Sequence, residues 1–348
     1  MEYLKNYGNS IKKFLEFIIY NFFTNIIIFS IFVEKIKKKN ILYSNCFGFG
    51  DYVHFCENIR KKLNKNNKIF CFSQAQFEIA KFFCEEKYIV KSFILMPRLL
   101  SESHLGYNFL LNNKIFTPIN LTKLGPDFKK IHISDFYVGT TNTINFLKKK
   151  INENNISKKV ANIFNKPTIC LYIKNFSNKK NNHINFQVRQ TRDLLKIESL
   201  INFLIRKNIN LIILGKERDN FIKIISPKIK QKMLKNVFLF KDLSDNYSIQ
   251  DQAYVALKSI GYIGSLSGAM CFFGLFNKES VIIDSPFSYN DKYFKNFYFL
   301  YKKIYNKKKK TLRIFVNGKY YNPVDHNIIE TTYKSIKKTL LIKILNKH

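Results

Sequence analysis

The sequence has no tryptophan, and only seven of its 59 basic residues are arginines. Arginine is the side chain that reads guanine through two parallel hydrogen bonds, so its scarcity disfavours sequence-specific nucleic-acid binding. No glycine-aromatic RNA-recognition signature and no zinc-finger spacing occurs.

Acidic residues number 24, which leaves a formal net charge of +35. Lysine carries this charge in a chain rich in Asn, Ile, Phe and Tyr, as AT-rich coding produces. The charge suits an anionic substrate or an anionic membrane surface.

Paired cysteines are also lacking. None of the six forms a CxxC pair or has a histidine at metal-ligand spacing. No DxD-type metal motif stands in a suitable loop. The pattern predicts buried free thiols in a reducing cytoplasm, with neither a metal site nor a protein-bound cofactor.

One hydrophobic stretch, Phe14 to Val33, is long enough to cross a bilayer. Polar residues interrupt it, however, and lysines flank both ends. These features favour a helix of residues 1–39 that lies on an anionic membrane. Two alternatives stay open, a spanning helix that leaves the rest of the chain in the cytoplasm and a helix packed on the first domain. No small-residue cleavage site follows, so a signal peptide is not indicated.

The rest of the chain alternates between strand and helix patterns, which indicates an α/β protein with parallel sheets. Strands are predicted at 41–45, 68–73, 89–95, 130–134, 168–173, 211–214, 237–240, 261–264 and 281–284. Helices are predicted at 52–63, 75–85, 141–151, 193–207, 249–258 and directly after 264–268. An Asn- and Lys-rich stretch at 152–166 predicts a linker. We therefore expect two Rossmann-like domains, at 40–160 and 161–348.

Candidate catalytic residues cluster around a glycine-rich turn. Gly48 and Gly50 follow the first predicted strand and would let the backbone approach a ligand, and Asp51 ends the turn. His54 lies one helical turn further on, and Asp135 follows the strand at 130–134. Carboxylates and histidines at the carboxyl ends of strands suit general-base catalysis. The simpler interpretation makes Asp51 a helix cap.

A second candidate site contains two of the seven arginines, Arg189 and Arg192. In a lysine-rich chain, arginine at this spacing indicates planar, bidentate recognition of a phosphate or carboxylate. The alternative is a surface pair at the start of a helix.

A third candidate site is a turn of small residues between a strand and a helix. Ser265, Ser267 and Gly268 would leave backbone N–H groups open to an anion such as a diphosphate. The alternative is an ordinary turn with a serine cap. Gly215 and Lys216 end another strand of the same expected sheet and should reach the same region.

The run from residue 240 to 286 resembles the donor half of GT-B glycosyltransferases, most of all the heptosyltransferase-like group. The loop Asp242–Ser244, the strand-turn GYIGSLSG and the strand KESVIID carry the resemblance, and the opening FGFGD adds to it. It covers residues 41–60 and 167–290, and Lys174 stands where the group has an arginine. The resemblance implies inverting, metal-independent transfer from a nucleotide sugar to a cell-surface glycan or lipid-linked acceptor. It also implies that Asp242 and Ser244 belong to the donor site and that Asp51 is the base.

Two other functions stay open at this point. A polysaccharide pyruvyl transferase has a similar two-domain build and would use phosphoenolpyruvate. A non-enzymatic protein could bind membranes or nucleic acid through its positive charge alone, and salt would then abolish binding. For the transferase we expect a cytoplasmic location, peripheral to or anchored at the inner face of the membrane.

Overall fold

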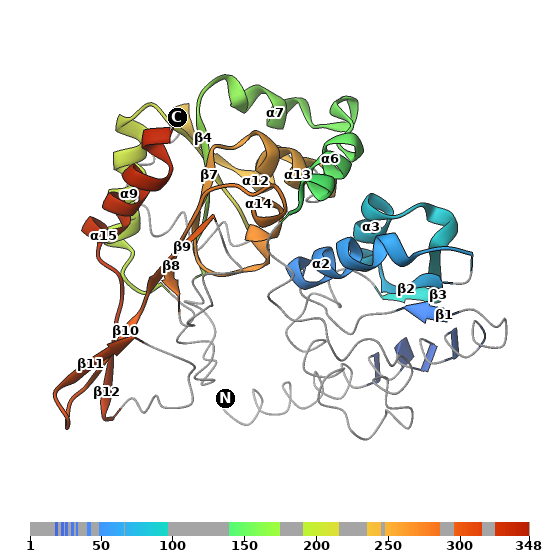
Figure 1. The fold of residues 1–348 in the computed structure, drawn as a ribbon, viewed down its shortest axis with the longest axis horizontal. Coiled ribbons are helices and arrows are strands. Elements are labelled where there is room, and N and C mark those ends of the chain that lie inside the picture. The colour runs from blue at the N-terminus through green and yellow to red at the C-terminus, as the bar shows by residue number, and fades with distance from the viewer. Residues whose placement is uncertain are drawn as a thin grey trace, which may run out of the picture. The chain divides into compact units, whose positions relative to one another are not determined.

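The structure is a computed structural model. The structure describes residues 40–42, 49–65, 67–96, 139–174, 191–215, 235–244, 248–285, 296–314 and 324–347, with scattered helical positions between 18 and 33. The chain divides into two compact units, Met1–Phe136 and Tyr137–His348 (Figure 1).

This division differs from the expected boundary at residues 160–161. Helices α6 (Thr141–Lys150) and α7 (Lys158–Ala161) both belong to the second unit. The connection between them is bonded to helix α13 (Ile249–Lys258) of that unit, because Ser157 N–H donates to Asp251 Oδ1 over 3.0 Å. Tertiary hydrogen bonds therefore place this polar stretch in the second unit, although its composition is that of a linker.

The first unit contains a parallel sheet with strand order β1-β2-β3. Its strands are β1 (Asn40–Leu42), β2 (Asn67–Ser73) and β3 (Ile89–Met96), and its helices are α2 (Phe49–Ile59) and α3 (Gln74–Phe83). The apolar face of α2 is buried, and Ser73 caps α3 by accepting a hydrogen bond from Gln76 N–H. These elements confirm the predicted alternation, while the strand expected at 130–134 lies outside the described residues.

The helical positions between 18 and 33 lie against strand β3. Phe93 N–H donates to Ser30 Oγ over 3.0 Å, and the rings of Phe29 and Phe93 are 5.7 Å apart. Phe22 and Phe29 are nevertheless exposed. Among the described residues, no helix is long and apolar enough to cross a membrane.

The second unit is built on a six-stranded sheet with strand order β6-β5-β4-β7-β8-β9, in which all neighbours are parallel. The strands are β4 (Thr168–Tyr172), β5 (Asn210–Ile213), β6 (Val237–Leu239), β7 (Gly261–Gly264), β8 (Ser280–Ser285) and β9 (Phe297–Tyr301). Strands β4 to β8 occur where the hydrophobic runs predicted them. Parallel strands are buried on both faces, which is why these runs are continuous rather than alternating.

Helices cover both faces of this sheet (Figure 1). Helices α9 (Leu195–Arg206) and α15 (Tyr333–Lys343) share one core with the strands, to which α9 contributes Leu200 and Leu204 and α15 contributes Leu340. Helices α13 and α14 (Cys271–Leu275) lie on the other side. The mixed α/β class with parallel sheets is therefore confirmed.

The C-terminal end of the chain adds elements that the sequence patterns did not predict. Strands β10 (Lys303–Asn306), β11 (Thr311–Ile314) and β12 (His326–Ile329) form an antiparallel sheet with order β11-β10-β12. Helix α15 then returns to the main sheet, where Thr332 caps it by accepting from Ser335 N–H. The last strand of the large sheet and the last helix are thus linked through a separate small sheet.

Candidate functional site

The carboxyl edge of the six-stranded sheet has a topological switch point between β4 and β7. From β4 the chain adds β5 and β6 in one direction, and from β7 it adds β8 and β9 in the other. The loops after β4 and β7 therefore diverge, and ligands of open α/β sheets bind in the crevice that this leaves. The candidate site of the second unit is built around these two strand ends.

Ser265 joins the ends of β4 and β7. Its N–H donates to Tyr172 O over 2.8 Å, and its Oγ accepts from Lys174 N–H over 3.0 Å. Tyr262 Oη donates to Ser265 O over 2.8 Å. The buried Ser265 side chain thus positions the backbone of both loops.

Two glycines allow the backbone to pass close to Tyr172. Gly264 has φ +156°, and a Cβ there would lie 2.1 Å from Tyr172 O. Gly215 has φ +102°, and a Cβ there would lie 2.7 Å from ring atom Cε2 of Tyr172. Only glycine adopts such positive φ angles without strain, so both strand ends require it.

The predicted turn at Ser267 and Gly268 is present. Ser267 Oγ accepts from Ala269 N–H over 3.2 Å and caps a short 3-10 helix, Gly268–Met270, that runs into α14. The serine side chain therefore serves as the N-cap that the simpler interpretation expected. Because the helix is short, any attraction for an anion would come from its first N–H groups more than from a helix dipole.

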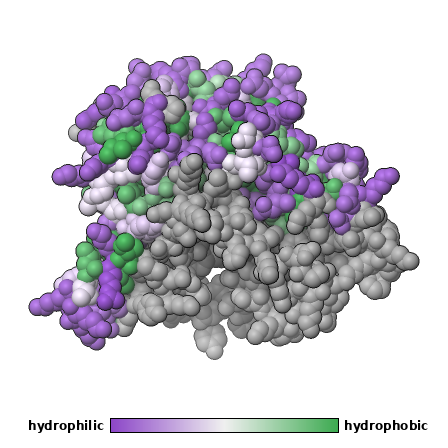
Figure 2. All heavy atoms as spheres, viewed as in Figure 1, coloured by the Kyte–Doolittle hydropathy of each residue, from purple (hydrophilic) through white to green (hydrophobic). Residues whose placement is uncertain are grey.

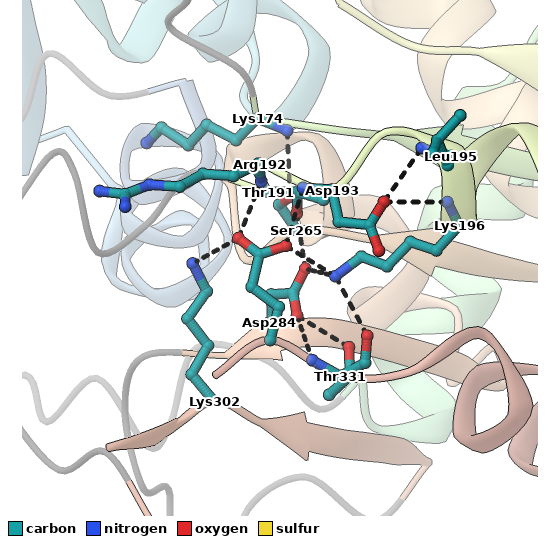
Figure 3. Close-up of polar contacts among 11 residues, drawn as sticks. Lys174, Thr191, Arg192, Asp193, Leu195, Lys196, Ser265, Asp284, Lys302 and Thr331 are labelled. Carbon is teal, nitrogen blue, oxygen red and sulfur yellow. Dashed lines mark hydrogen bonds and ion pairs between the residues drawn. The ribbon is translucent and has the colours of Figure 1, made fainter. Parts of the chain in front are cut away.

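Arg192 lies next to this edge. Thr191 N–H donates to Lys174 O over 3.1 Å, which brings the segment before α9 alongside the segment after β4. The Arg192 side chain is exposed, and Figure 3 shows it extended in the same direction as the side chain of Lys174. The structure thus brings two cations to the edge that carries Ser265 and Gly215.

A buried ion-pair cluster holds the Arg192 segment in place (Figure 3). Lys196 Nζ lies 2.7 Å from Asp284 Oδ2 and 2.8 Å from Glu330 Oε2. Glu330 also accepts from the N–H groups of Arg192 (2.8 Å) and Asp193 (3.1 Å). A single carboxylate therefore fixes the backbone on both sides of the Arg192 side chain.

Asp284 connects this cluster to β8. Its φ of +52° is unusual for a non-glycine residue, and both of its carboxylate oxygens are bonded. Oδ1 accepts from N–H and Oγ1 of Thr331, each over 2.8 Å, while Oδ2 accepts from Thr191 Oγ1 over 2.9 Å and from Lys196. Bonds to every side of the carboxylate offset the backbone strain of this conformation.

Opposing effects set the ionisation of the cluster. Burial alone would raise the pKa of Glu330, but the charges of Lys302 and Lys196 outweigh it and lower that pKa. Burial lowers the pKa of Lys302, and the carboxylates of Glu330 and Asp284 oppose this. Sequence reasoning missed all four residues, although Asp284 ends a predicted strand and could have been suspected from its position.

A cavity of about 540 Å³ adjoins the cluster. Its lining residues are Arg192, Asp193, Leu195, Lys196, Ser199, Ile328, Glu330, Thr331, Thr332 and Tyr333. Neither Ser265 nor Gly215 lines it, so the cavity and the switch-point edge have Arg192 in common but are different places. The switch-point edge, where the strand ends converge, is the candidate ligand site of this unit.

Other predicted residues of the second unit have structural roles or lie apart. Ser244 Oγ donates to Asp251 Oδ2 over 2.6 Å and accepts from Ser248 N–H, which fixes the start of α13. Asp242 is exposed on the short helix α12 (Phe240–Leu243). Arg189 and Lys216 lie outside the described residues.

The glycine-rich turn of the first unit is described only in part. Helix α2 already begins at Phe49, so Asp51 lies inside its first turn rather than before the helix. Gly50 is buried, whereas Gly48, Asp135 and the Asp51 side chain lie outside the described residues. His54 is buried, and burial lowers its pKa to about 3, so this imidazole is neutral and weakly basic.

No protein-family model matches the chain, and no curated protein matches it. Solved structures that are similar in part include two heptosyltransferases. The E. coli ADP-heptose lipopolysaccharide heptosyltransferase II has a TM-score of 0.44 and 8% identity, over 75% of this chain and 90% of that one. The E. coli heptosyltransferase WaaC with ADP-2-deoxy-2-fluoro heptose has a TM-score of 0.30 and 9% identity, over 75% of this chain and 65% of that one.

Proposed function

We propose that this protein is a glycosyltransferase that moves a sugar from a nucleotide-activated donor to a cell-surface glycan or a lipid-linked acceptor. The observation that carries the proposal is the switch-point edge. There Gly264 and Gly215 lie against Tyr172, Ser265 bonds to Lys174 N–H, and Thr191 brings the Arg192 segment alongside Lys174. The resemblance of residues 240–286 to the donor half of heptosyltransferase-like enzymes supports the same site.

In this proposal, the donor diphosphate lies against the first N–H groups after Ser267. Arg192 would bind it through its planar guanidinium, and Lys174 would add a point charge. Two cations can balance the charge that develops on the leaving nucleotide diphosphate, which is the role a divalent metal has in other transferases. Transfer should therefore continue when metals are chelated.

Inverting transfer requires a base on the acceptor side. The acceptor hydroxyl oxygen forms a bond to the anomeric carbon, the bond to the diphosphate oxygen breaks, and the hydroxyl proton passes to a base. We assign this role to Asp51, with Asp135 as the reserve. The sequence also offers His54 as a base, but its burial and low pKa make it a poor proton acceptor.

We further propose that the enzyme works at the inner face of a membrane, where lipid-linked acceptors are found. The exposed side chains of Phe22 and Phe29, in a segment flanked by lysines, support an interfacial position for the N-terminal helix. The contacts of Ser30 and Phe29 with β3 fit the alternative that this segment packs on the first unit. A segment can pack on the first unit and still expose other side chains to a membrane.

Thermal-shift screening against nucleotide sugars and nucleotide diphosphates tests the proposal. A ligand at 100 times its Kd stabilises the folded state by about 2.7 kcal/mol, so one nucleotide class should raise the Tm clearly. Transfer from the selected donor should persist in EDTA. Stabilisation by phosphoenolpyruvate without any response to nucleotide sugars would instead indicate a pyruvyl transferase, and no response to either would refute the proposal.

A further inference from the structure

The small sheet β11-β10-β12 forms an arm with unusual surface chemistry. It extends from the end of β9 and lies at the lower left of Figure 1. In the same region, Figure 2 shows hydrophobic side chains and a hydrophilic tip. All four residues of β11 are exposed. Ile328 of β12 lines the cavity next to Arg192, on the face that also carries its register partner Ile304. The proposed transfer reaction makes no use of the opposite face of the arm.

One face of the arm carries apolar side chains that are open to solvent, together with the polar residues Lys303 and Asn327. The register pairs Tyr305 with Leu312, and Lys303 with both Ile314 and Ile329. Because paired residues of antiparallel strands lie on the same face, these side chains gather on one surface. Leu312, Ile314 and Ile329 are 51%, 50% and 43% exposed. Exposed apolar side chains that adjoin one another indicate an interaction surface rather than chance exposure.

The tip of the arm is basic. The turn between β10 and β11 consists of four consecutive exposed lysines, Lys307–Lys310. Asp325 lies 2.9 Å from Lys308 and offsets one of these charges. The arm therefore combines an aliphatic face with an excess of positive charge at its tip.

We propose that this arm docks on an anionic phospholipid bilayer, with the lysine tip against the headgroups and the aliphatic face in the interface. Basic residues next to apolar ones bind such surfaces by combining charge attraction with burial of apolar area. Proteins that bind RNA on a sheet stack bases on aromatic side chains, whereas the exposed apolar side chains of this face, Leu312, Ile314 and Ile329, are aliphatic. Pairing of β11 with a second copy is disfavoured because the strand has four residues and follows a lysine run.

Sedimentation of the full chain with vesicles tests the proposal. The vesicles are phosphatidylcholine alone, or phosphatidylcholine with phosphatidylglycerol. The variant Lys308→Gln, Lys309→Gln, Lys310→Gln should bind the anionic vesicles at least tenfold more weakly, since each lysine near an anionic surface contributes about a fivefold factor. The variant Leu312→Ser, Ile314→Ser should also bind more weakly, and its loss should persist at high salt because burial of apolar area is not screened.

A matched control removes equal charge elsewhere in the same unit. Lys148, Lys149 and Lys158 are exposed, so changing them to Gln should leave vesicle binding near the wild-type value. Arm variants that bind vesicles as the wild type does would overturn the proposal and assign membrane binding to the N-terminal segment. If the arm variants lost binding to RNA in a parallel assay but kept vesicle binding, that result would also overturn the proposal. Neither measurement contains a nucleotide sugar, so neither result depends on the proposed transferase function.

Discussion

At the scale of single residues, two cations at the switch-point edge differ in what they can bind. Lys174 carries a compact ammonium on a flexible stem, whereas Arg192 carries a planar fork that matches two phosphate oxygens. The backbone of Arg192 is fixed by Glu330, so its side chain begins from a defined position. Side-chain shape as well as charge should therefore determine donor affinity.

Arg192→Lys should weaken binding of the nucleotide donor by about tenfold, because one of two parallel hydrogen bonds is lost while the charge is kept. Isothermal titration with the nucleotide found by thermal-shift screening measures this change. Arg206→Lys, at the exposed far end of α9, is the matched control and should bind normally. Equal affinity for the wild type and Arg192→Lys would remove Arg192 from the donor site.

At the scale of elements, the ion-pair cluster ties together segments that are far apart in the sequence. Lys196 comes from α9, Asp284 from β8, and Glu330 from the residues before α15. A buried ion pair adds little net stability over an apolar replacement, but removal of one partner leaves a buried charge and costs about 3–5 kcal/mol. We therefore expect the cluster to define how these elements meet more than to add net stability.

The lowered pKa of Glu330 predicts an acid-dependent loss of stability. A carboxyl whose folded-state pKa is lowered stabilises the fold above its unfolded pKa, near the ordinary 4.5, and loses that contribution as pH falls through the folded-state pKa. Urea unfolding should show Glu330→Gln less stable than the wild type at pH 7, with the difference shrinking below pH 4.5. A difference that stays constant into acid would contradict the assigned ionisation. Glu153→Gln, an exposed site, is the control.

At the scale of the whole molecule, the proposal divides the reaction between the two units. The donor edge belongs to the second unit, and the proposed base, Asp51, belongs to the first. Loss of the base should therefore affect turnover and donor binding differently.

Asp51→Asn should lower kcat by about 10²–10⁴-fold, the usual contribution of general-base catalysis, and leave donor Kd near normal. Steady-state kinetics with donor titration measures both. Near-normal turnover would exclude Asp51 as the base. A large fall in Tm would instead favour its role in the first turn of α2, where a carboxylate interacts well with the helix N-terminus.

Local patterns in the sequence determined the α/β class and most of the elements. Strands β4 to β8 and helices α6, α9 and α13 occur within a few residues of their predicted positions, because strand and helix periodicities are properties of neighbouring residues. The glycines at 215 and 264 could likewise be anticipated, since strand-to-loop turns require their backbone freedom.

Only the tertiary structure decided how the site is held and what surrounds it. Lys196 bonds to residues 88 and 134 positions away, and no local pattern encodes such pairs. The small sheet β10–β12 and its apolar face depend on registers between strands that the polar, lysine-rich sequence does not mark. The stretch at 152–166, whose composition suggested a linker, belongs with helix α6 to the second unit through long-range hydrogen bonds of Lys150 and Ser157 to α13. The periodicity of a segment determines whether it forms a helix or a strand. Which other segments it contacts depends on packing and ion pairing across the whole fold.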